Sequence, residues 1–269
     1  MIDLHCHILP SIDDGSDSLE TSLKMAELAV ADGIELIACT PHILPGKYDN
    51  SVVGIEHAFQ LFKEELGKNN IPLNLTYASE THVMPDLLQK LRERTVPTFN
   101  QGRYFLLEFP HHCGLPHLES LVFNLLAAGY VPVIAHPERL RWINQGYEMF
   151  KRLVRNGAWM QVTAGSLTGR FDKSAKYWAD RLLDEGLIHI LATDAHSLKN
   201  RAPRLYEGFA AAEKRLGTSE AMQLVKVRPQ AILDNTSPEL VLPVSFLSNT
   251  AGKAKGKPSI FSRIFSKLS

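Results

Sequence analysis

The sequence of 269 residues lacks a charge excess and a long apolar run, and each absence excludes a class of protein. Lys and Arg together number 29, as do Asp and Glu, so the net charge is zero and nothing indicates a nucleic-acid partner. No apolar stretch is long enough to cross a membrane. What is present, 45% hydrophobic and 22% charged residues, is typical of a soluble globular protein.

Cysteine is scarce as well, with Cys6, Cys39 and Cys113 as the three in the chain. An odd number, with a strand expected to begin at residue 2 and no signal peptide, favours reduced thiols in a cytoplasmic protein over a disulfide framework. No pair has C-x-x-C spacing. A cysteine nucleophile with an Arg-capped phosphate loop is not supported either, because the residues six positions later are Ile12, Pro45 and Glu119.

Short apolar runs and amphipathic stretches alternate along most of the chain. We predict seven strands, over 2–8, 34–40, 73–82, 104–109, 130–135, 158–163 and 187–193. Helical periodicity follows most of them, over 19–30, 55–66, 118–128, 147–155 and 173–185. Because right-handed βαβ connections stack the helices outside a parallel sheet, this order predicts an α/β fold that is a closed or nearly closed barrel.

The first expected strand contains the motif His5-Cys-His7, two histidines separated by one residue. Strict alternation would place Ile2, Leu4, Cys6 and Ile8 on one face of the strand and both imidazoles on the other. Their Cα atoms would lie roughly 7 Å apart, which lets two imidazoles converge on one divalent ion.

Histidines and carboxylates recur at the carboxyl ends of the expected strands, which is where (β/α) barrels carry their function. Because five imidazoles and four carboxylates exceed the needs of one ion, we expect two or three ions with a bridging carboxylate. The predicted ligands are His5, His7, Asp14, His42, Glu80, Glu108, His136, Asp194 and His196. A mixed set of nitrogen and oxygen donors suits Mn, Fe or Zn better than Ca or Mg.

Two arginines follow predicted ligands closely: Arg139 comes three residues after His136, and Arg201 comes five after His196. A guanidinium at the rim of a metal site would hold phosphate oxygens in pairs and stabilise charge in the transition state. Clustered divalent ions lower the pKa of a bound water and clamp the oxygens of a phosphoryl displacement. The leading chemistry is therefore metal-assisted hydrolysis.

The chain changes character near its end. We predict one domain over 1–243, followed by a flexible tail over 244–269 with a basic run at 251–258 and apolar residues at helical spacing after it. Such a segment fits an anionic membrane surface or a partner's groove, and it equally fits a solvated terminus.

Taken together, these motifs resemble the PHP (polymerase and histidinol phosphatase) superfamily, whose fold is a distorted (β/α)7 barrel. Within it, the chain looks like the bacterial protein tyrosine phosphatases of CpsB/CapC/YwqE type from residue 1 to about 240. The matching motifs are His5-Cys-His7, Asp13-Asp-Gly15, Thr40-Pro-His42, Glu80, Glu108, His136-Pro-Glu-Arg139, Asp194-Ala-His196 and Arg201.

The resemblance implies a site for three ions that favours Mn, with Fe, Zn or Mg as alternatives. His5, His7, Glu80 and Asp194 would bind the first, Glu80, Glu108 and His136 the second, and Asp14, His42 and His196 the third, with Asp13 as the alternative to Asp14. A hydroxide bridging the metals would attack phosphotyrosine while Arg139 and Arg201 hold the phosphate.

The implied substrate is the Tyr-rich tail of a membrane-bound bacterial tyrosine kinase, in the regulation of capsule or exopolysaccharide synthesis. Three other interpretations stay open on the sequence. They are a phosphoesterase for a small substrate such as histidinol phosphate, an amidohydrolase-type barrel, and a non-catalytic scaffold that binds the kinase.

Overall fold

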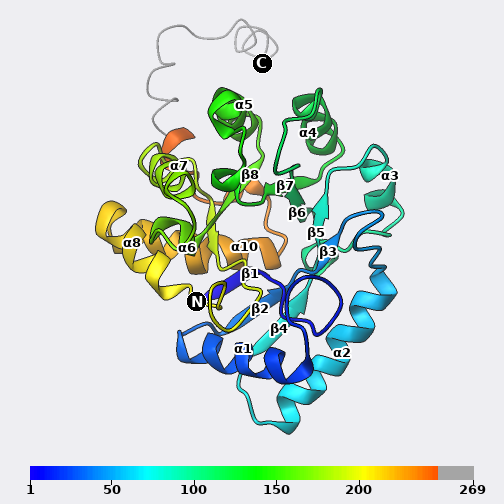
Figure 1. The fold of residues 1–269 in the computed structure, drawn as a ribbon. Helices are drawn as coiled ribbons and strands as arrows, with labels where there is room; N and C mark the ends of the chain where they lie inside the picture. The colour runs from blue at the N-terminus through cyan, green and yellow to red at the C-terminus, as the bar shows by residue number, and fades with distance from the viewer. Residues whose placement is uncertain (248–269) are drawn as a thin grey trace, which may run out of the picture.

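A computed structural model describes residues 1–247 and shows a parallel sheet that curls on itself with helices outside it (Figure 1). Every strand pairing is parallel. The strands are β1 (Ile2–Cys6), β2 (Leu36–Cys39), β3 (His42–Ile43), β4 (Asn74–Tyr77), β5 (Glu80–His82), β6 (Tyr104–Glu108), β7 (Val131–Ile134), β8 (Trp159–Thr163) and β9 (Ile190–Ala192).

Helices connect successive strands and cover the outer face of the sheet. They are α1 (Leu19–Ala31), α2 (Val52–Lys68), α3 (Leu87–Arg92), η1 (Phe99–Gln101), α4 (Leu118–Ala127), η2 (Pro137–Arg139), α5 (Ile143–Arg155), α6 (Ala164–Leu167) and α7 (Lys173–Asp184). The chain continues through α8 (Tyr206–Leu216), α9 (Thr218–Met222), the π-helical turn η3 (Gln223–Val227), α10 (Arg228–Leu233) and η4 (Pro238–Leu240).

The strands form two sheets, in the orders β1-β2-β4 and β3-β5-β6-β7-β8-β9. The sheets separate where two neighbouring strands are interrupted, at Thr40 and Pro41 and at Ala78 and Ser79. Pro41 has no N–H to donate to a ladder, and Ala78 and Ser79 lie opposite this break, between the pairs Cys39–Tyr77 and His42–Glu80. Counting each interrupted strand once turns the nine described segments into the seven expected strands.

Backbone hydrogen bonds close the ring at the carboxyl ends of the strands. Asp194 N donates to His5 O at 2.8 Å, and His7 N donates to Ala195 O at 2.9 Å, which joins the end of β9 to β1. At the amino-terminal side of the barrel, β4 is an edge strand of its sheet within the described chain. There η1 lies beside β4, and Thr76 Oγ1 donates to Asn100 Oδ1 at 2.6 Å. The predicted distorted barrel is thus confirmed.

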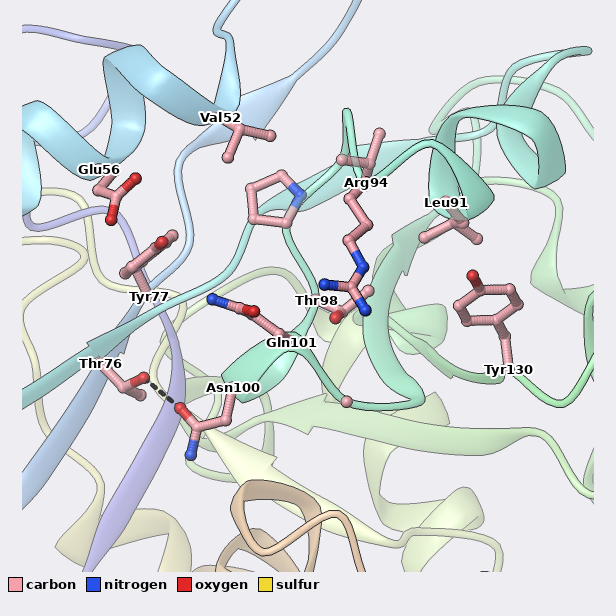
Figure 2. Close-up of a pocket in the computed structure, with 13 residues that line it drawn as sticks. Val52, Glu56, Thr76, Tyr77, Leu91, Arg94, Thr98, Asn100, Gln101 and Tyr130 are labelled. Atoms are coloured by element: carbon pink, nitrogen blue, oxygen red, sulfur yellow. Dashed lines mark hydrogen bonds between the residues drawn. The ribbon is translucent and has the colours of Figure 1, made fainter.

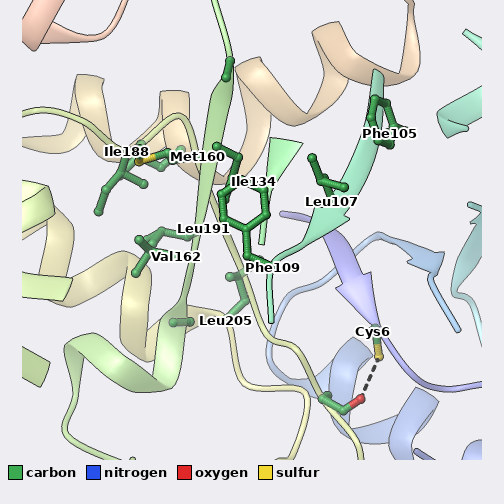
Figure 3. Packing of buried hydrophobic residues seen from close by; sticks show 14 of the residues in the cluster. Cys6, Phe105, Leu107, Phe109, Ile134, Met160, Val162, Ile188, Leu191 and Leu205 are labelled. Atoms are coloured by element: carbon green, nitrogen blue, oxygen red, sulfur yellow. Dashed lines mark hydrogen bonds between the residues drawn. The ribbon is translucent and has the colours of Figure 1, made fainter. Parts of the chain in front are cut away.

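Two apolar layers hold the barrel together. The outer layer packs alternate strand residues such as Phe105, Leu107 and Val162 against the helices (Figure 3). The inner layer fills the lower barrel with the other alternate set, including Leu4, Tyr104 and Trp159, and Ile232 and Leu233 of α10 join it from below. The polar site lies above this inner layer, at the carboxyl ends of the strands.

The expectation of a single apolar face on the first strand was wrong. Leu4 belongs to the inner layer, whereas Cys6 belongs to the outer one and its thiol donates to Ala195 O (Figure 3). The register slips between Asp3 and Cys6, where β1 has one residue more than β2. Such a bulge re-aims side chains next to a site, and here it lets Leu4 and His5 both face inward.

Two further expectations need correction. The stretch 73–82 forms two strands in different sheets rather than one. The fold also contains α8, α9, η3 and α10, which helical periodicity alone did not predict. Arg228 at the start of α10 is fully buried and pairs with Glu220 Oε1 at 2.8 Å, so a charged residue occupies a core position.

The predicted tail begins within the described residues. Val244 is buried, and the Phe246 ring lies 4.9 Å from the Arg155 guanidinium, so contacts with the barrel run past residue 243. The basic run at 251–258 and the apolar residues after it lie outside the described residues. Among the residues described, no helix has the length and apolar character needed to cross a bilayer.

Candidate metal centre

All nine predicted ligands meet in one cluster at the carboxyl ends of the strands. Ligand atoms of His5, His7, Glu80 and Asp194 lie within 4.8 Å of one another, as do those of two further groups. The second group is His7, Asp14, His42 and His196, and the third is His42, Glu80 and Glu108. His136 joins the cluster because its Nε2 lies 2.8 Å from Glu80 Oε1.

His5 and His7 form the floor of this cluster, with their Nε2 atoms 3.2 Å apart. Each ring is fixed through its other nitrogen. His5 Nδ1 lies 2.9 Å from Gln161 Oε1, and His7 Nδ1 lies 2.7 Å from Asp13 Oδ2. Because both acceptors hold the proton on Nδ1, the Nε2 lone pairs of both rings are free to face a cation.

The two adjacent aspartates have different positions. Asp14 Oδ1 faces the cluster, 3.3 Å from His42 Nε2 and 3.5 Å from His196 Nε2. Asp13 lies behind His7 and also accepts from His42 N at 3.0 Å and Gly15 N at 2.9 Å. The loop fits this tightly because residue 15 is Gly: a Cβ there would lie 2.1 Å from His7 O.

Two of the strand-end residues have strained backbone. His136 has φ +30° and Asp194 has φ +50°, in the left-handed region that residues other than Gly rarely adopt. Such strain persists where the surroundings fix the conformation, and it clusters at functional sites. Behind His136, Glu138 Oε1 accepts from Thr163 N at 3.0 Å and Ser166 Oγ at 2.8 Å, which ties η2 to β8 and α6.

Both predicted arginines reach the cluster and converge on Asp194. Arg201 Nη2 lies 2.7 Å from Asp194 Oδ1, and Arg139 Nη1 donates to Asp194 Oδ2. The Arg139 guanidinium also lies over the Phe171 ring, 4.5 Å from its centroid. Arg201 is brought in by its own backbone, since its carbonyl accepts from His196 N at 2.8 Å.

Charges within the cluster shift the pKa values of its members strongly. Burial alone would raise the pKa of Glu80, but His5 and His42 beside it hold that pKa well below its usual range. Burial and the nearby Glu80 raise the pKa of Glu108 to about 8. Burial lowers the pKa of His196 to about 4, with His7 adding to the effect, so its imidazole is neutral as a metal ligand must be.

The donor set fits divalent cations. The Nε2 atom of His5 lies 3.3 Å from Glu80 Oε2 and 3.3 Å from Asp194 Oδ1, and His7 Nε2 lies 3.2 Å from the same Glu80 oxygen. Ligands about 2.0–2.2 Å from one ion have mutual separations of roughly 2.9–3.5 Å at tetrahedral or octahedral angles. The buried atoms His42 Nδ1, His136 Nδ1 and His196 Nε2 also have no hydrogen-bond partner in the described chain.

The grouping of ligands differs in part from the predicted sets. The first predicted set, His5, His7, Glu80 and Asp194, coincides with one group of converging atoms. Around Glu80 and Glu108 the converging histidine is His42, whereas His136 approaches the other oxygen of Glu80. The group around Asp14 adds His7 to the predicted His42 and His196. The assignment of ligands to individual ions stays a prediction.

A cavity of about 420 Å³ opens above the cluster. Its walls include both arginines and most of the predicted ligands, and its rim consists of Leu44, Lys47, Tyr48, His82, His111 and His112. The Tyr48 ring stacks on His42 at 5.4 Å with an interplanar angle of 9°. Burial, together with the charge of Arg139, lowers the pKa of His111 to about 4, so this rim residue is neutral.

Sequence reasoning missed the residues that support the ligands. Gln161 is the single strongly polar amide in the apolar strand β8, and that contrast is the signal that could have found it. Asp13 was considered only as an alternative ligand. Asp3, which accepts from Thr193 N at 3.0 Å and His5 N at 3.2 Å, was counted merely as part of the strand's alternation.

A curled parallel (β/α) barrel with buried imidazoles and carboxylates at its strand ends defines the class: barrel proteins that present nitrogen and oxygen ligands for divalent cations at that face. Comparison with known proteins gives the family. Residues 1–234 match the family model described as capsular polysaccharide synthesis, CpsB/CapC, and the chain belongs to this family.

Relatives agree over most of the chain. The tyrosine-protein phosphatase YwqE of Bacillus subtilis (strain 168) is 38% identical over 87% of this chain and 92% of its own length. The tyrosine-protein phosphatase CpsB of Streptococcus agalactiae is 31% identical over 87% of this chain and 99% of its own. A solved structure from work on YwqE and Streptococcus pneumoniae CpsB, called metal-dependent tyrosine phosphatases, superposes with a TM-score of 0.84 at 38% identity, covering 88% of this chain and 96% of that one.

Proposed function

We propose that this protein is a metal-dependent tyrosine phosphatase, which hydrolyses the phosphate monoester of phosphotyrosine in a protein substrate. The observation that carries the proposal is the position of two arginines on the wall of the cavity whose floor is the nine-residue ligand cluster. A site of this kind matches a phosphate group by charge and by geometry. The names of the relatives support the same activity.

The proposed ligands are the nine residues of the cluster, and bound divalent ions would supply Lewis acidity and an activated water. We propose Mn as the resident metal, with Fe, Zn or Mg as alternatives, because the donors are imidazole nitrogens and carboxylate oxygens. Cys6 and Cys39, on β1 and β2, are buried, and burial raises the pKa values of their thiols, so neither acts as a thiolate.

The arginines would bind the phosphate. Arg139 and Arg201 reach the same carboxylate, Asp194, from two sides, so their guanidinium groups already lie within reach of a shared anion. Planar guanidinium groups bind phosphate oxygens in pairs, and they stabilise the charge that builds up on those oxygens during transfer. Arg201 Nε is buried without a partner in the described chain, which leaves a donor available.

The rim would receive the aromatic ring of the substrate. Leu44 and Tyr48 belong to one short loop, which is held by hydrogen bonds from Leu44 N to Tyr48 O at 3.0 Å and from Tyr48 N to Leu44 O at 2.8 Å. Leu44 and the Tyr48 ring, which line the same cavity as the arginines, suit a phenyl ring better than the charged imidazole and amine of histidinol phosphate. This favours phosphotyrosine over that small phosphoester.

The test is the initial rate of phosphate release from a phosphotyrosine peptide by metal-stripped protein, before and after addition of Mn. We expect activity to appear with Mn, to be lost in His42→Ala and to persist in His57→Ala, which changes an exposed histidine on α2. The same protein should be slower on histidinol phosphate. If the Mn-loaded protein leaves the peptide intact, the proposed activity is wrong.

The proposed physiological substrate is the Tyr-rich tail of a membrane-bound bacterial tyrosine kinase, with the reaction in the cytoplasm. The family's role in capsular polysaccharide synthesis supports this assignment. The basic tail would add peripheral membrane contact and so raise the local concentration near the kinase. Deleting residues 251–269 should then reduce co-sedimentation with anionic lipid vesicles, and unchanged co-sedimentation would contradict a membrane role.

A further inference from the structure

A second cavity lies on the outside of the barrel, at the gap between the edge strand β4 and the start of β6. Its volume is about 420 Å³, equal to that of the cavity above the metal cluster, and the two cavities share no lining residue. Residues of α2, β4, the segment after α3, and η1 line it. The gap exists because the short η1, rather than another strand, lies next to β4.

One side of this second cavity presents unpaired hydrogen-bond donors. Figure 2 shows the Arg94 guanidinium extending toward Thr98, with Gln101 on one side of it and Tyr130 on the other. In the described chain, the side chains of Arg94, Thr98 and Gln101 take part in no hydrogen bond or ion pair with the protein. Arg94 and Gln101 are exposed and Thr98 is half-buried, so a guanidinium, an amide and a hydroxyl on this side are available to an anion.

The backbone fixes where these donors lie. Arg94, with φ +57°, ends α3 in a left-handed turn in which Arg94 N donates to Leu91 O at 3.2 Å and Thr95 N to Lys90 O at 2.9 Å. Asn100 and Gln101, with φ +47° and +57°, adopt the left-handed conformation within η1. Asn100 is fixed by bonds to Thr76 and to Leu233 O, which holds the neighbouring Gln101 at the rim. The strain of the left-handed conformation persists where surrounding contacts fix it, and ligand sites are a common location.

The rest of the wall is apolar and aromatic. Val52, Leu91 and Val96 contribute aliphatic surface, and the rings of Tyr77 and Tyr130 lie on opposite sides (Figure 2). Glu56 stands beside Tyr77, away from Arg94 (Figure 2). Repulsion from this carboxylate would turn an anionic group toward Arg94 and leave the apolar wall to the body of the ligand.

We propose that this cavity, between α2, β4 and η1, is a second binding site, specific for a small organic anion with a flat apolar ring and one carboxylate or phosphate group. Arg94, Thr98 and Gln101 would bind the anionic group, and Tyr77 and Tyr130 would flank the ring. One hydrogen bond links the cavity wall to the strand that carries Glu80. Ser79, next to Glu80, donates to Pro97 O at 3.3 Å, and Pro97 lines the cavity.

The experiment is an NMR titration of methyl-labelled protein, loaded with Zn as a diamagnetic substitute for Mn, with benzoate and, separately, with phenylphosphonate. Benzoate tests a carboxylate and phenylphosphonate tests a phosphate group. We expect at least one probe to shift the methyl signals of Val52, Leu91, Val96 and Thr98. Leu44, on the rim of the other cavity, reports separately any binding above the metal cluster.

Matched variants assign the anion contact. Arg94→Met keeps the aliphatic stem and removes the charge, so we expect at least tenfold weaker binding of the probe. Arg92→Met is the control, because Arg92 is also exposed, makes no ion pair in the described chain and lies outside the cavity. The proposal is overturned if neither probe shifts the four methyl signals, or if Arg94→Met binds as tightly as Arg92→Met.

Discussion

At the scale of single residues, the side chains that orient the ligands matter as much as the ligands. Gln161 accepts from His5 Nδ1 at 2.9 Å and lies 3.3 Å from His136 N, so one amide oxygen serves two predicted ligands. Partners of this kind fix the tautomer and the direction of a metal-binding ring, and their loss commonly weakens metal affinity 10- to 100-fold.

We therefore expect Gln161→Leu to weaken Mn binding by about 10- to 100-fold while the protein stays folded. Leucine is close in size but offers His5 no acceptor. The measurement is a titration of metal-stripped protein followed by the electron paramagnetic resonance signal of free Mn. Gln145→Leu, an exposed change on α5, is the control. Equal affinity in the two variants would show that Gln161 does not orient His5.

A buried histidine far from the cluster gives the protein a pH dependence. His189 accepts from Met160 N at 3.1 Å through Nδ1 and stacks on Trp159, and burial holds its pKa well below the usual value. Above pH 6.5 the ring is neutral in both folded and unfolded chains. Below pH 6.5 only the unfolded chain takes up the proton, so the free energy of unfolding falls as pH falls.

His189→Asn should flatten this dependence, because Asn keeps an acceptor for Met160 N and does not titrate. Between pH 6.5 and 5.5 we expect the free energy of unfolding of the wild type to fall more than that of the variant, by about 1 kcal/mol. Urea denaturation at the two pH values measures this. His57→Asn, on an exposed face, should behave as the wild type. Parallel curves for His189→Asn and the wild type would contradict the assignment.

At the scale of elements, the joint between β1 and β9 closes the barrel. β9 has only three residues, and the Asp3 carboxylate replaces part of the missing ladder by accepting from the backbone and hydroxyl of Thr193. Asp3 is fully buried, and burial raises its pKa to about 6. Its hydrogen bonds to Thr193 and His5 N offset part of the cost of burying the carboxylate charge.

Removing this carboxylate should loosen the joint. We expect Asp3→Ala to lower the free energy of unfolding by about 2–4 kcal/mol, since two buried N–H groups and one hydroxyl lose their acceptor. Urea denaturation at pH 7.5 provides the measurement. Asp86→Ala, which removes an exposed carboxylate paired with Lys90, should change it by less than about 0.5 kcal/mol. A similar loss in both variants would show that the joint is not specially dependent on Asp3.

The elements also show what sequence reasoning could and could not reach. Strand positions followed from apolar runs because buried parallel strands are apolar on both faces, and the strand-end rule then located all nine clustered side chains. The bulge in β1 and the split at Ala78 and Ser79 left no mark on residue pattern, because both depend on pairing with β2 and β3. Gln161 and Asp13 were missed because their role is defined by the ring nitrogen that they face.

At the scale of the whole molecule, the cluster draws its members from both sheets. His5 and His7 come from β1 and the residue just after it, in one sheet, whereas Glu80 is the first residue of β5 in the other. Two like-charged carboxylates, Glu80 and Glu108, lie close together there, and the second has its pKa raised as a result of burial and this proximity. Bound cations would relieve that repulsion across the boundary between the sheets.

Mn should therefore stabilise the entire protein. At a free concentration one hundred times the Kd, a ligand specific for the folded state adds about 2.7 kcal/mol to the free energy of unfolding. We expect Tm to rise with Mn in the wild type and in His57→Ala, and to rise much less in His5→Ala. Differential scanning calorimetry of metal-stripped protein gives the answer. A Tm that does not respond to Mn would argue against a site formed by folding.

The interruption of two strands at Thr40-Pro41 and at Ala78-Ser79 divides the barrel into two sheets that meet at this boundary. The ligand cluster spans this boundary, so bound metal would hold the two sheets together. The strength of that link would depend on how much metal the surroundings supply. A cell short of the metal would thus lose more than catalytic turnover. The two sheets would separate more easily, and proteases would cleave the chain sooner. Metal supply would set the lifetime of the protein as well as its rate.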